Sequence, residues 1–178
     1  MPAYVALLRA MNVAGTGKLP MADLRRMATN CGFANVRTYI ASGNLLFDSD
    51  LAEDDARAAL GHEVDAFFGK PVPFFGKPVP IFVRTQTELD AIVFANPFPD
   101  EKGSRLMVFF LGQAATPAML AEARGQQGER MAIGTREIYV AYGDGIGKTK
   151  LIIPVVKTGT ARNINTVTKL AAMLATAA

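Results

Sequence analysis

Two short loops combine glycines with a lysine, the residue types that proteins use to hold an anion. They are residues 15–18, Gly-Thr-Gly-Lys, and residues 145–149, Gly-Ile-Gly-Lys-Thr. Glycines let backbone N–H groups approach a phosphate closely, and the lysine adds positive charge beside them. Each loop is therefore either an anion-binding turn, with Lys18 or Lys148 as a ligand, or an ordinary turn with an exposed lysine.

The second loop is similar to a Walker A motif, G-x-x-x-x-G-K-[ST], but lacks its first glycine. Counting back from Gly147-Lys148-Thr149, the required position holds Tyr142, and Gly143 comes one residue too late. No alternation of parallel strands and helices follows. We therefore do not predict a P-loop nucleoside triphosphatase.

The most polar stretch of the chain is residues 158–166, Thr-Gly-Thr-Ala-Arg-Asn-Ile-Asn-Thr. Thr160 or Asn163 is expected to cap the final helix. From the start of that helix, the Arg162 guanidinium can donate bidentate hydrogen bonds to a phosphate or carboxylate. The alternative is a capped helix with a purely structural arginine.

Several mechanisms are excluded by residue counts. The chain has one histidine, His62, in a helix expected to be exposed, and one cysteine, Cys31, at a helix end. Neither a Cys-His pair nor a multi-histidine metal site can be assembled from them. Asp23, Glu122 and Glu137 show no spacing that singles out an acid and base pair. We predict no metal and no cofactor, and whether the chain is an enzyme stays open.

Hydrophobic periodicity in the first half predicts the order β-α-β-β-α-β of a ferredoxin-like fold. Gly32 is the expected stop of the first helix, and a hairpin or glycine bulge is expected at 42–44. The expected strands cover residues 4–13, two runs within 36–47, and 81–84, and the expected helices cover 21–31 and 53–68.

The second half repeats much of this order after a linking helix at 87–95. Its expected elements are a strand at 105–111, a helix at 117–124, strands at 130–133 and 137–142, and a final helix at 163–174. Residues 151–156 are rich in β-formers but contain Pro154, which predicts an edge strand or an irregular segment. The face of the final helix is expected to carry Ile164, Val167, Ala171 and Leu174.

The predicted fold class is thus α+β, with two ferredoxin-like subdomains and a C-terminal helix. We place the first subdomain at residues 1–85. The linking helix, second subdomain and C-terminal helix take residues 86–178.

A heptad, Phe-Phe-Gly-Lys-Pro-Val-Pro, stands at residues 67–73 and again without change at 74–80. Identity over seven residues indicates a tandem duplication rather than a solenoid unit. One copy leads into Ile81, and the other is expected to form a proline-rich surface loop. A role as a P-x-x-P ligand is the minor alternative.

Composition suggests a location in the cytoplasm. Half of the 178 residues are apolar, enough for a sizeable core, yet no apolar run reaches the roughly 20 residues that span a bilayer. Arg9 interrupts the first apolar stretch, where a secretory signal needs continuity. A lone Cys31 fits a reducing compartment and is expected as a buried thiol.

Charge is divided unevenly along the chain. No acid follows Asp144, while five bases do, so the tail carries +5 and the remainder, with 14 bases and 16 acids, carries −2. Such asymmetry predicts an anionic partner near the C-terminal third or a solvated basic face.

Four segments together resemble the bacterial domain-of-unknown-function family 1697. They are residues 4–13 (Tyr-Val-Ala-Leu-Leu-Arg-Ala-Met-Asn-Val), 37–44 (Arg-Thr-Tyr-Ile-Ala-Ser-Gly-Asn), 96–98 (Asn-Pro-Phe) and 160–167 (Thr-Ala-Arg-Asn-Ile-Asn-Thr-Val). The resemblance covers nearly the whole chain and implies two ferredoxin-like subdomains but no activity, because none is established for the family. Departures are Ala10-Met11 in place of Gly-Ile, Ile164 in place of Trp, and the duplicated heptad.

By this resemblance, the polar residues of the family's motifs fall on Arg9, Asn12, Lys18, Ser42, Asn44, Arg162, Asn163 and Asn165. With Lys148 they form our candidate ligand-binding set, and some are expected to converge on one anionic site in a cleft between the halves. The prediction is a binding protein for a phosphate-bearing small molecule or nucleotide. Alternatives are a nucleic-acid-binding protein, a small transferase or hydrolase using the same cleft, and an oligomeric interaction protein; no membrane partner is expected, and the oligomeric state stays open.

Overall fold

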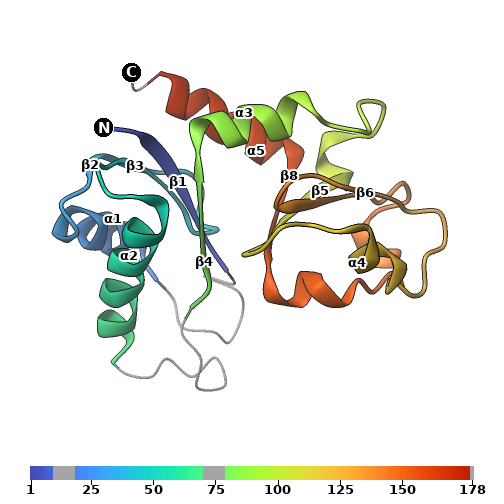
Figure 1. The fold of residues 1–178 in the computed structure, drawn as a ribbon, viewed down its shortest axis with the longest axis horizontal. Helices are drawn as coiled ribbons and strands as arrows, with labels where there is room; N and C mark the ends of the chain where they lie inside the picture. Colours follow the sequence, from blue (N-terminus) through green and yellow to red (C-terminus); the bar gives the residue numbers. More distant parts are fainter. Residues whose placement is uncertain (10–18, 70–78, 177–178) are drawn as a thin grey trace. The chain divides into compact units, whose positions relative to one another are not determined.

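The computed structural model of the chain describes residues 1–9, 19–69 and 79–176. It has an α+β fold with two four-stranded antiparallel sheets and a C-terminal helix, as two ferredoxin-like subdomains require. The sheet orders are β2-β3-β1-β4 and β6-β7-β5-β8, so each sheet repeats the strand arrangement of the other (Figure 1). The predicted fold class is confirmed.

The chain divides into two compact units. The first contains Met1–Glu88 together with residues from Leu170 onward, and the second contains Leu89–Lys169. The sequence places the boundary after residue 85 and keeps the whole C-terminal helix with the second half. In the structure the last turns of that helix belong to the first unit, where Arg37 Nη1 donates to the Met173 carbonyl at 2.9 Å.

The first unit follows the predicted order closely. Its elements are β1 (Ala3–Leu8), α1 (Met21–Asn30), β2 (Ala34–Thr38), β3 (Asn44–Asp48), α2 (Glu53–Phe68) and β4 (Ile81–Thr85). Helix α1 stops where expected, because Gly32 adopts a left-handed φ of 78°. Strand β1 ends at Leu8, five residues earlier than predicted, and residues 10–13 lie outside the described residues.

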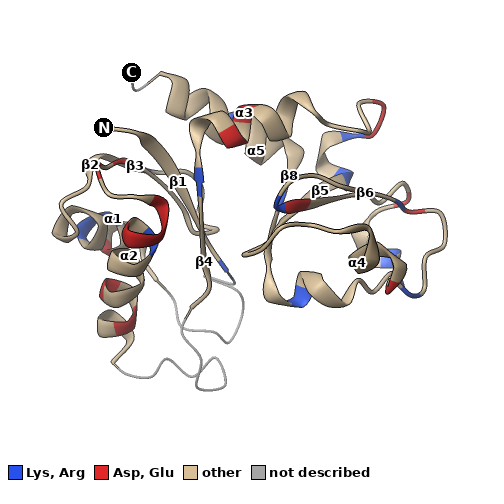
Figure 2. Cartoon of the chain, viewed as in Figure 1, with Lys and Arg blue, Asp and Glu red and all other residues tan. Residues whose placement is uncertain are grey.

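Helices α1 and α2 cover one face of the first sheet (Figure 1). The buried positions of α2, Ala56, Leu60 and Val64, recur every four residues and pack into the same core as Phe47 of β3. Phe33 stacks on Phe47 with ring centroids 4.2 Å apart. Figure 2 shows the acidic residues of α2 on the ribbon; those of its first turn are placed to favour helix initiation.

The second unit has the same strand order with shorter helices. Its elements are α3 (Gln86–Phe94, begun in the first unit), the 3₁₀ turn η1 (Gly103–Arg105), β5 (Leu106–Phe110), α4 (Pro117–Ala121), β6 (Arg130–Ile133), β7 (Glu137–Ala141), the 3₁₀ turns η2 (Ile146–Lys148) and η3 (Pro154–Thr158), β8 (Thr160–Asn163) and α5 (Ile164–Ala175). Thr85 and Glu88 cap α3 reciprocally, with Thr85 N donating to Glu88 Oε2 and Glu88 N to Thr85 Oγ1.

One strand was not predicted. Strand β8 lies within the polar stretch 158–166 and pairs with β5, so Thr160 is a strand residue and does not cap a helix. Its buried positions, Thr160 and Arg162, are polar. The strand therefore lacks the alternation of apolar and polar residues by which a strand is predicted from sequence. Asn163 is the cap, since its Oδ1 accepts from Thr166 N at 2.9 Å.

Of the two alternatives for residues 151–156, the structure shows the irregular segment: Ile152 forms a single bridge with Arg124, and Pro154 begins η3. Helix α4 ends at Ala121 instead of residue 124, which leaves Arg124 extended for that bridge. The predicted apolar face of α5 is confirmed, because Ile164, Val167, Ala171 and Leu174 are all buried.

Candidate functional site

The two units differ most between their last two strands. In the first unit, β3 and β4 are joined through the 16-residue helix α2. In the second unit, β7 and β8 are joined by residues 142–159, which contain only the two short 3₁₀ turns. This segment carries the predicted loop Gly145-Ile146-Gly147-Lys148-Thr149. A departure from an internal repeat is a natural place for function, because the fold does not require it.

A pocket of about 390 Å³ lies in this part of the second unit. Its volume is within the range of small-molecule sites. Two segments line it, residues 127–129 and residues within 142–149. The lining residues are Gly128, Gly143 and Gly145 together with Gln127, Glu129, Tyr142, Asp144, Lys148 and Thr149. Of the predicted candidates, Lys148 is therefore placed in a pocket.

Glu129 organises the pocket wall. Its carboxylate accepts a short hydrogen bond from the Thr149 hydroxyl and one from the Gln127 backbone N–H at 2.6 Å. Its carbonyl accepts from Gln126 Nε2, also at 2.6 Å. The Thr149 hydroxyl first, and then the Gln127 backbone N–H, hold the pKa of Glu129 below its usual range, so the buried carboxylate is ionised at neutral pH.

Tyr142 forms the other wall. Its ring belongs to the apolar core on the α4 side of the sheet, and the residue is 8% exposed. Burial, and then the charge of Glu129, raise the pKa of its phenol. The phenol therefore stays protonated and polar beside the ionised carboxylate.

The loop that carries Lys148 is held in place by backbone contacts. Arg124 and Ile152 exchange two hydrogen bonds of 2.9 and 2.8 Å. Gly125 has φ 73°, and any side chain there would collide with the carbonyl of Lys150. Leu151 N donates to Thr149 Oγ1 at 3.0 Å. The Gly-Lys loop is thus anchored at its C-terminal end.

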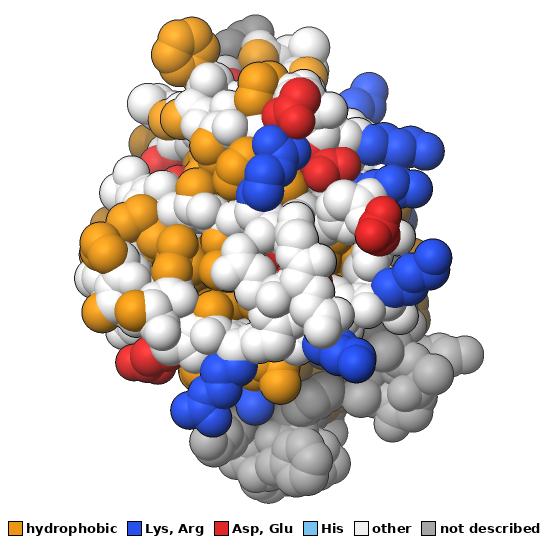
Figure 3. All heavy atoms as spheres, turned by 90° about the vertical axis from the view of Figure 1, so that its right-hand side faces the viewer, with side chains coloured by type: hydrophobic (Ala, Val, Ile, Leu, Met, Phe, Trp, Pro, Cys, Tyr) orange, Lys and Arg blue, Asp and Glu red, His pale blue; other side chains and the backbone are white. Residues whose placement is uncertain are grey.

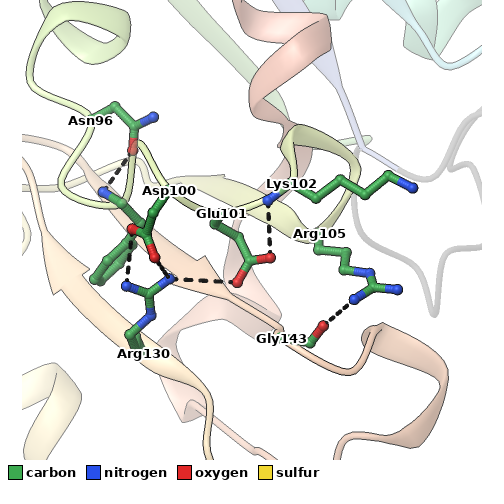
Figure 4. A network of polar contacts seen from close by, with 8 residues as sticks. Asn96, Asp100, Glu101, Lys102, Arg105, Arg130 and Gly143 are labelled. Carbon is green, nitrogen blue, oxygen red and sulfur yellow. Dashed lines mark hydrogen bonds and ion pairs between the residues drawn. The ribbon is translucent and has the colours of Figure 1, made fainter.

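A polar network reaches the pocket rim from the segment between α3 and β5 (Figure 4). Arg130 pairs with Asp100 at 2.9 Å and lies over the Phe98 ring at 4.8 Å. Arg105 donates a short hydrogen bond to the carbonyl of Gly143, a pocket residue. In Figure 4, Lys102 and Arg105 extend to the same side, and Arg105 brings a cation to the pocket rim through its bond to Gly143.

Ser42 and Asn44 lie at the β2–β3 turn of the first unit. The buried Asn44 donates to the Tyr39 carbonyl at 3.0 Å and to Ser42 Oγ at 2.9 Å. These bonds hold a turn in which the exposed Ile40 has φ 50°, a costly conformation for a β-branched residue. In this structure both polar side chains stabilise a turn.

Three candidates come from the end of β1 and the loop after it. Arg9 follows β1, is partly exposed, and its backbone N–H donates to the Pro80 carbonyl at 3.0 Å. Asn12 and Lys18, with the whole 15–18 loop, lie outside the described residues. Most of the duplicated heptad does too.

The remaining candidates belong to β8 and α5. Arg162 is buried, and its Nη1 donates to Thr160 Oγ1 at 3.0 Å and to the Ala161 carbonyl at 2.8 Å. Burial lowers its pKa to about 10, which leaves it charged at neutral pH. Asn163 caps α5, and the side chain of Asn165 lies against Gly103, where no Cβ would fit.

Glu129, Gln127 and Asp144 are pocket residues that sequence reasoning did not single out. They come from two segments that meet only in the folded unit, and acid spacing along the chain carries no sign of this. Within the described residues, no group of three or more His, Cys, Asp or Glu is placed to hold a metal. His62 is exposed, as expected, but Cys31 is half-buried rather than buried.

Charge on the surface is mixed. The ribbon after Asp144 carries Lys and Arg but no acid (Figure 2). On the face shown in Figure 3, however, positive side chains are spread toward the edges with Asp and Glu between them. Among the helices that the structure describes, none combines the length and apolar character needed to cross a bilayer.

Comparison with known proteins finds one family model and a similar solved structure. The family model described as "Protein of unknown function (DUF1697)" matches residues 1–139. The solved structure of conserved bacterial protein SP0830 from Streptococcus pneumoniae is similar, with a TM-score of 0.73 and 25% identity, over 97% of this chain and 98% of that chain. No curated protein matches the chain.

Proposed function

The chain belongs to the family of proteins of unknown function DUF1697, and from its own geometry we propose that it is a cytoplasmic binding protein for a small phosphate-bearing molecule. The proposed site is the pocket of residues 127–149. The sequence predicts an anionic site in a cleft between the two halves. The site proposed here uses residues of the second unit alone.

The observation that carries the proposal is the position of Lys148. It is a cation in a glycine-lined pocket, at the place where the second unit departs from the repeat. Arg105 adds a second cation at the rim through its bond to Gly143. A phosphate monoester bound here gains charge-assisted hydrogen bonds that a neutral ligand does not.

The Gly-Lys loop is also held by hydrogen bonds before any ligand binds. The Arg105 to Gly143 bond holds the segment just before the loop, and the Thr149 to Glu129 bond and the Arg124 to Ile152 bridge hold its end and the segment just after it. Preorganisation lowers the entropic cost of binding. A loop held this way is more useful to a binding site than to a simple connection.

A thermal-shift screen with inorganic phosphate, sugar phosphates and nucleotides tests the proposal. We expect a saturable rise in melting temperature with at least one phosphate-bearing compound, because a ligand of the folded state stabilises it. Lys148→Gln should abolish the rise. Lys150→Gln is the matched control, since it removes the same charge from an exposed position two residues away, outside the pocket lining.

Binding of short oligonucleotides, measured for wild type and both lysine variants, tests the alternative of a nucleic-acid-binding protein. A nucleic-acid-binding protein would show affinity that falls steeply with salt and drops similarly in both lysine variants. The mixed charge of the face in Figure 3 argues against that outcome. Phosphate-dependent stabilisation that is unchanged in Lys148→Gln would contradict the proposed site.

A further inference from the structure

Resting on the proposed function, we infer that the ligand is a phosphorylated sugar or polyol rather than a nucleotide. The pocket lining is mostly polar, and it contains two carboxylates as well as the lysine. The composition of this lining sets what the non-phosphate part of the ligand must offer.

The two carboxylates require hydrogen-bond donors. Glu129 is held ionised by its own hydrogen bonds, and an ionised carboxylate only accepts. Asp144 is exposed and lies in the same lining. A ligand made only of phosphate would meet repulsion from both acids. Hydroxyl groups attached to the phosphate turn the same acids into favourable partners.

The pocket offers no face on which a base could stack. Tyr142 is the one aromatic residue among the lining residues that the structure describes, and its ring is packed in the core at 8% exposure. In proteins that bind single-stranded nucleic acids, stacking on an exposed aromatic ring contributes much of the affinity for a base. Without it, a base adds bulk to the ligand but little affinity.

Size is consistent with this class. About 390 Å³ lies at the lower end of the range for small-molecule pockets. A pentose or hexose phosphate fits within such a volume and carries groups that the lining can satisfy. We expect Lys148 to bind the phosphate, and Asp144 and Glu129 to accept hydrogen bonds from the hydroxyl groups.

Calorimetric titration of the full chain with ribose 5-phosphate, AMP, inorganic phosphate and ribose tests the inference. We expect ribose 5-phosphate to bind at least tenfold more tightly than phosphate or ribose alone, and AMP to bind no more tightly than ribose 5-phosphate. AMP binding tenfold more tightly than ribose 5-phosphate would overturn the inference. Phosphate alone binding as well as the sugar phosphate would do the same.

Asp144→Asn separates recognition of the sugar from recognition of the phosphate. We expect it to weaken ribose 5-phosphate about five- to tenfold and to leave inorganic phosphate unchanged or slightly tighter, because a nearby negative charge is removed. Asp90→Asn, on the exposed side of α3, is the matched control and should change neither. An equal loss for both ligands in Asp144→Asn would contradict the assigned role.

The two proposals fail in different ways. If no phosphate-bearing probe, inorganic phosphate included, shows binding that depends on Lys148, the proposed function falls and the inference with it. If Lys148-dependent binding is present but favours AMP, only the sugar-phosphate inference falls.

Discussion

Asn44 and Glu137 occupy the same place in the two sheets. Asn44 opens β3 opposite Leu7 of β1, and Glu137 opens β7 opposite Phe110 of β5. Both side chains are buried, and each bonds the hairpin turn that precedes its strand. An amide in one unit and a carboxylate in the other therefore perform the same structural task.

Replacing Asn44 tests that task in the first unit. Asn44→Ala removes a buried amide and its hydrogen bonds to Tyr39 and Ser42 from the turn that holds Ile40 at positive φ. We expect a loss of about 1–3 kcal/mol in the free energy of unfolding, measured by urea denaturation. Asn30→Ala is the control, because Asn30 bonds Glu63 on the surface and should cost less than about 0.5 kcal/mol. Equal losses in both variants would refute the role of Asn44.

Two glycines make a matched pair that tests the turn of the second unit. In Gly134→Ala the new Cβ collides with the Glu137 carboxylate, which must give up its bonds to Thr135 N and Arg136 N. We expect a loss of about 2 kcal/mol. Gly61, inside α2, has open space around it, so Gly61→Ala should raise stability by about 0.5–1 kcal/mol. Chemical denaturation of both variants decides, and two changes of the same sign would contradict the geometry.

These turns show why sequence reasoning recovered the fold better than the site. The strand order follows from apolar periodicity, which is local and survives in residues such as Leu60 and Val140. The equivalence of Asn44 and Glu137 is invisible in the sequence, because different side chains satisfy the same backbone groups. Strand β8 was missed for a related reason: Thr160 and Arg162 fill inward positions that usually hold apolar residues.

The pocket illustrates the same limit. Lys148 was predicted because glycines and a lysine adjacent in sequence have a recognisable chemistry. Glu129 lies 19 residues earlier in the chain and reaches Thr149 only through the β6–β7 sheet and the Arg124 to Ile152 bridge. Contacts between residues this far apart in the sequence depend on tertiary packing, and no local sequence pattern predicts them.

The Glu129 to Thr149 bond should make stability depend on pH. The folded-state pKa of Glu129 lies below its usual value, so this contribution is present above the unfolded-state pKa of about 4.3 and is lost as the pH falls through the folded-state value. Thr149→Val removes the donor. We expect wild type to melt higher than Thr149→Val at pH 7, with the difference shrinking toward pH 3.

Thr158→Val is the control for that measurement. Its hydroxyl donates to the Val155 carbonyl at 2.8 Å, a group that does not titrate. The melting difference between wild type and Thr158→Val should therefore be the same at pH 7 and pH 3. A Thr149→Val difference that is equally constant would show that Glu129 does not draw its ionisation from Thr149.

The reactivity of Cys31 gives the last prediction. Burial, followed by the charge of Glu63, raises the pKa of the Cys31 thiol to about 11. Only the thiolate is nucleophilic, so at pH 8 about a hundredfold less of the reactive form is present than for a thiol of ordinary pKa. We expect the rate of iodoacetamide alkylation of the folded chain to keep rising up to about pH 11. Glu63→Gln removes the smaller cause and should shift the profile to lower pH, whereas Glu122→Gln, at a carboxylate of the second unit that is not among these causes, should not. A profile that levels off near pH 9 in the folded protein would contradict the environment described for Cys31.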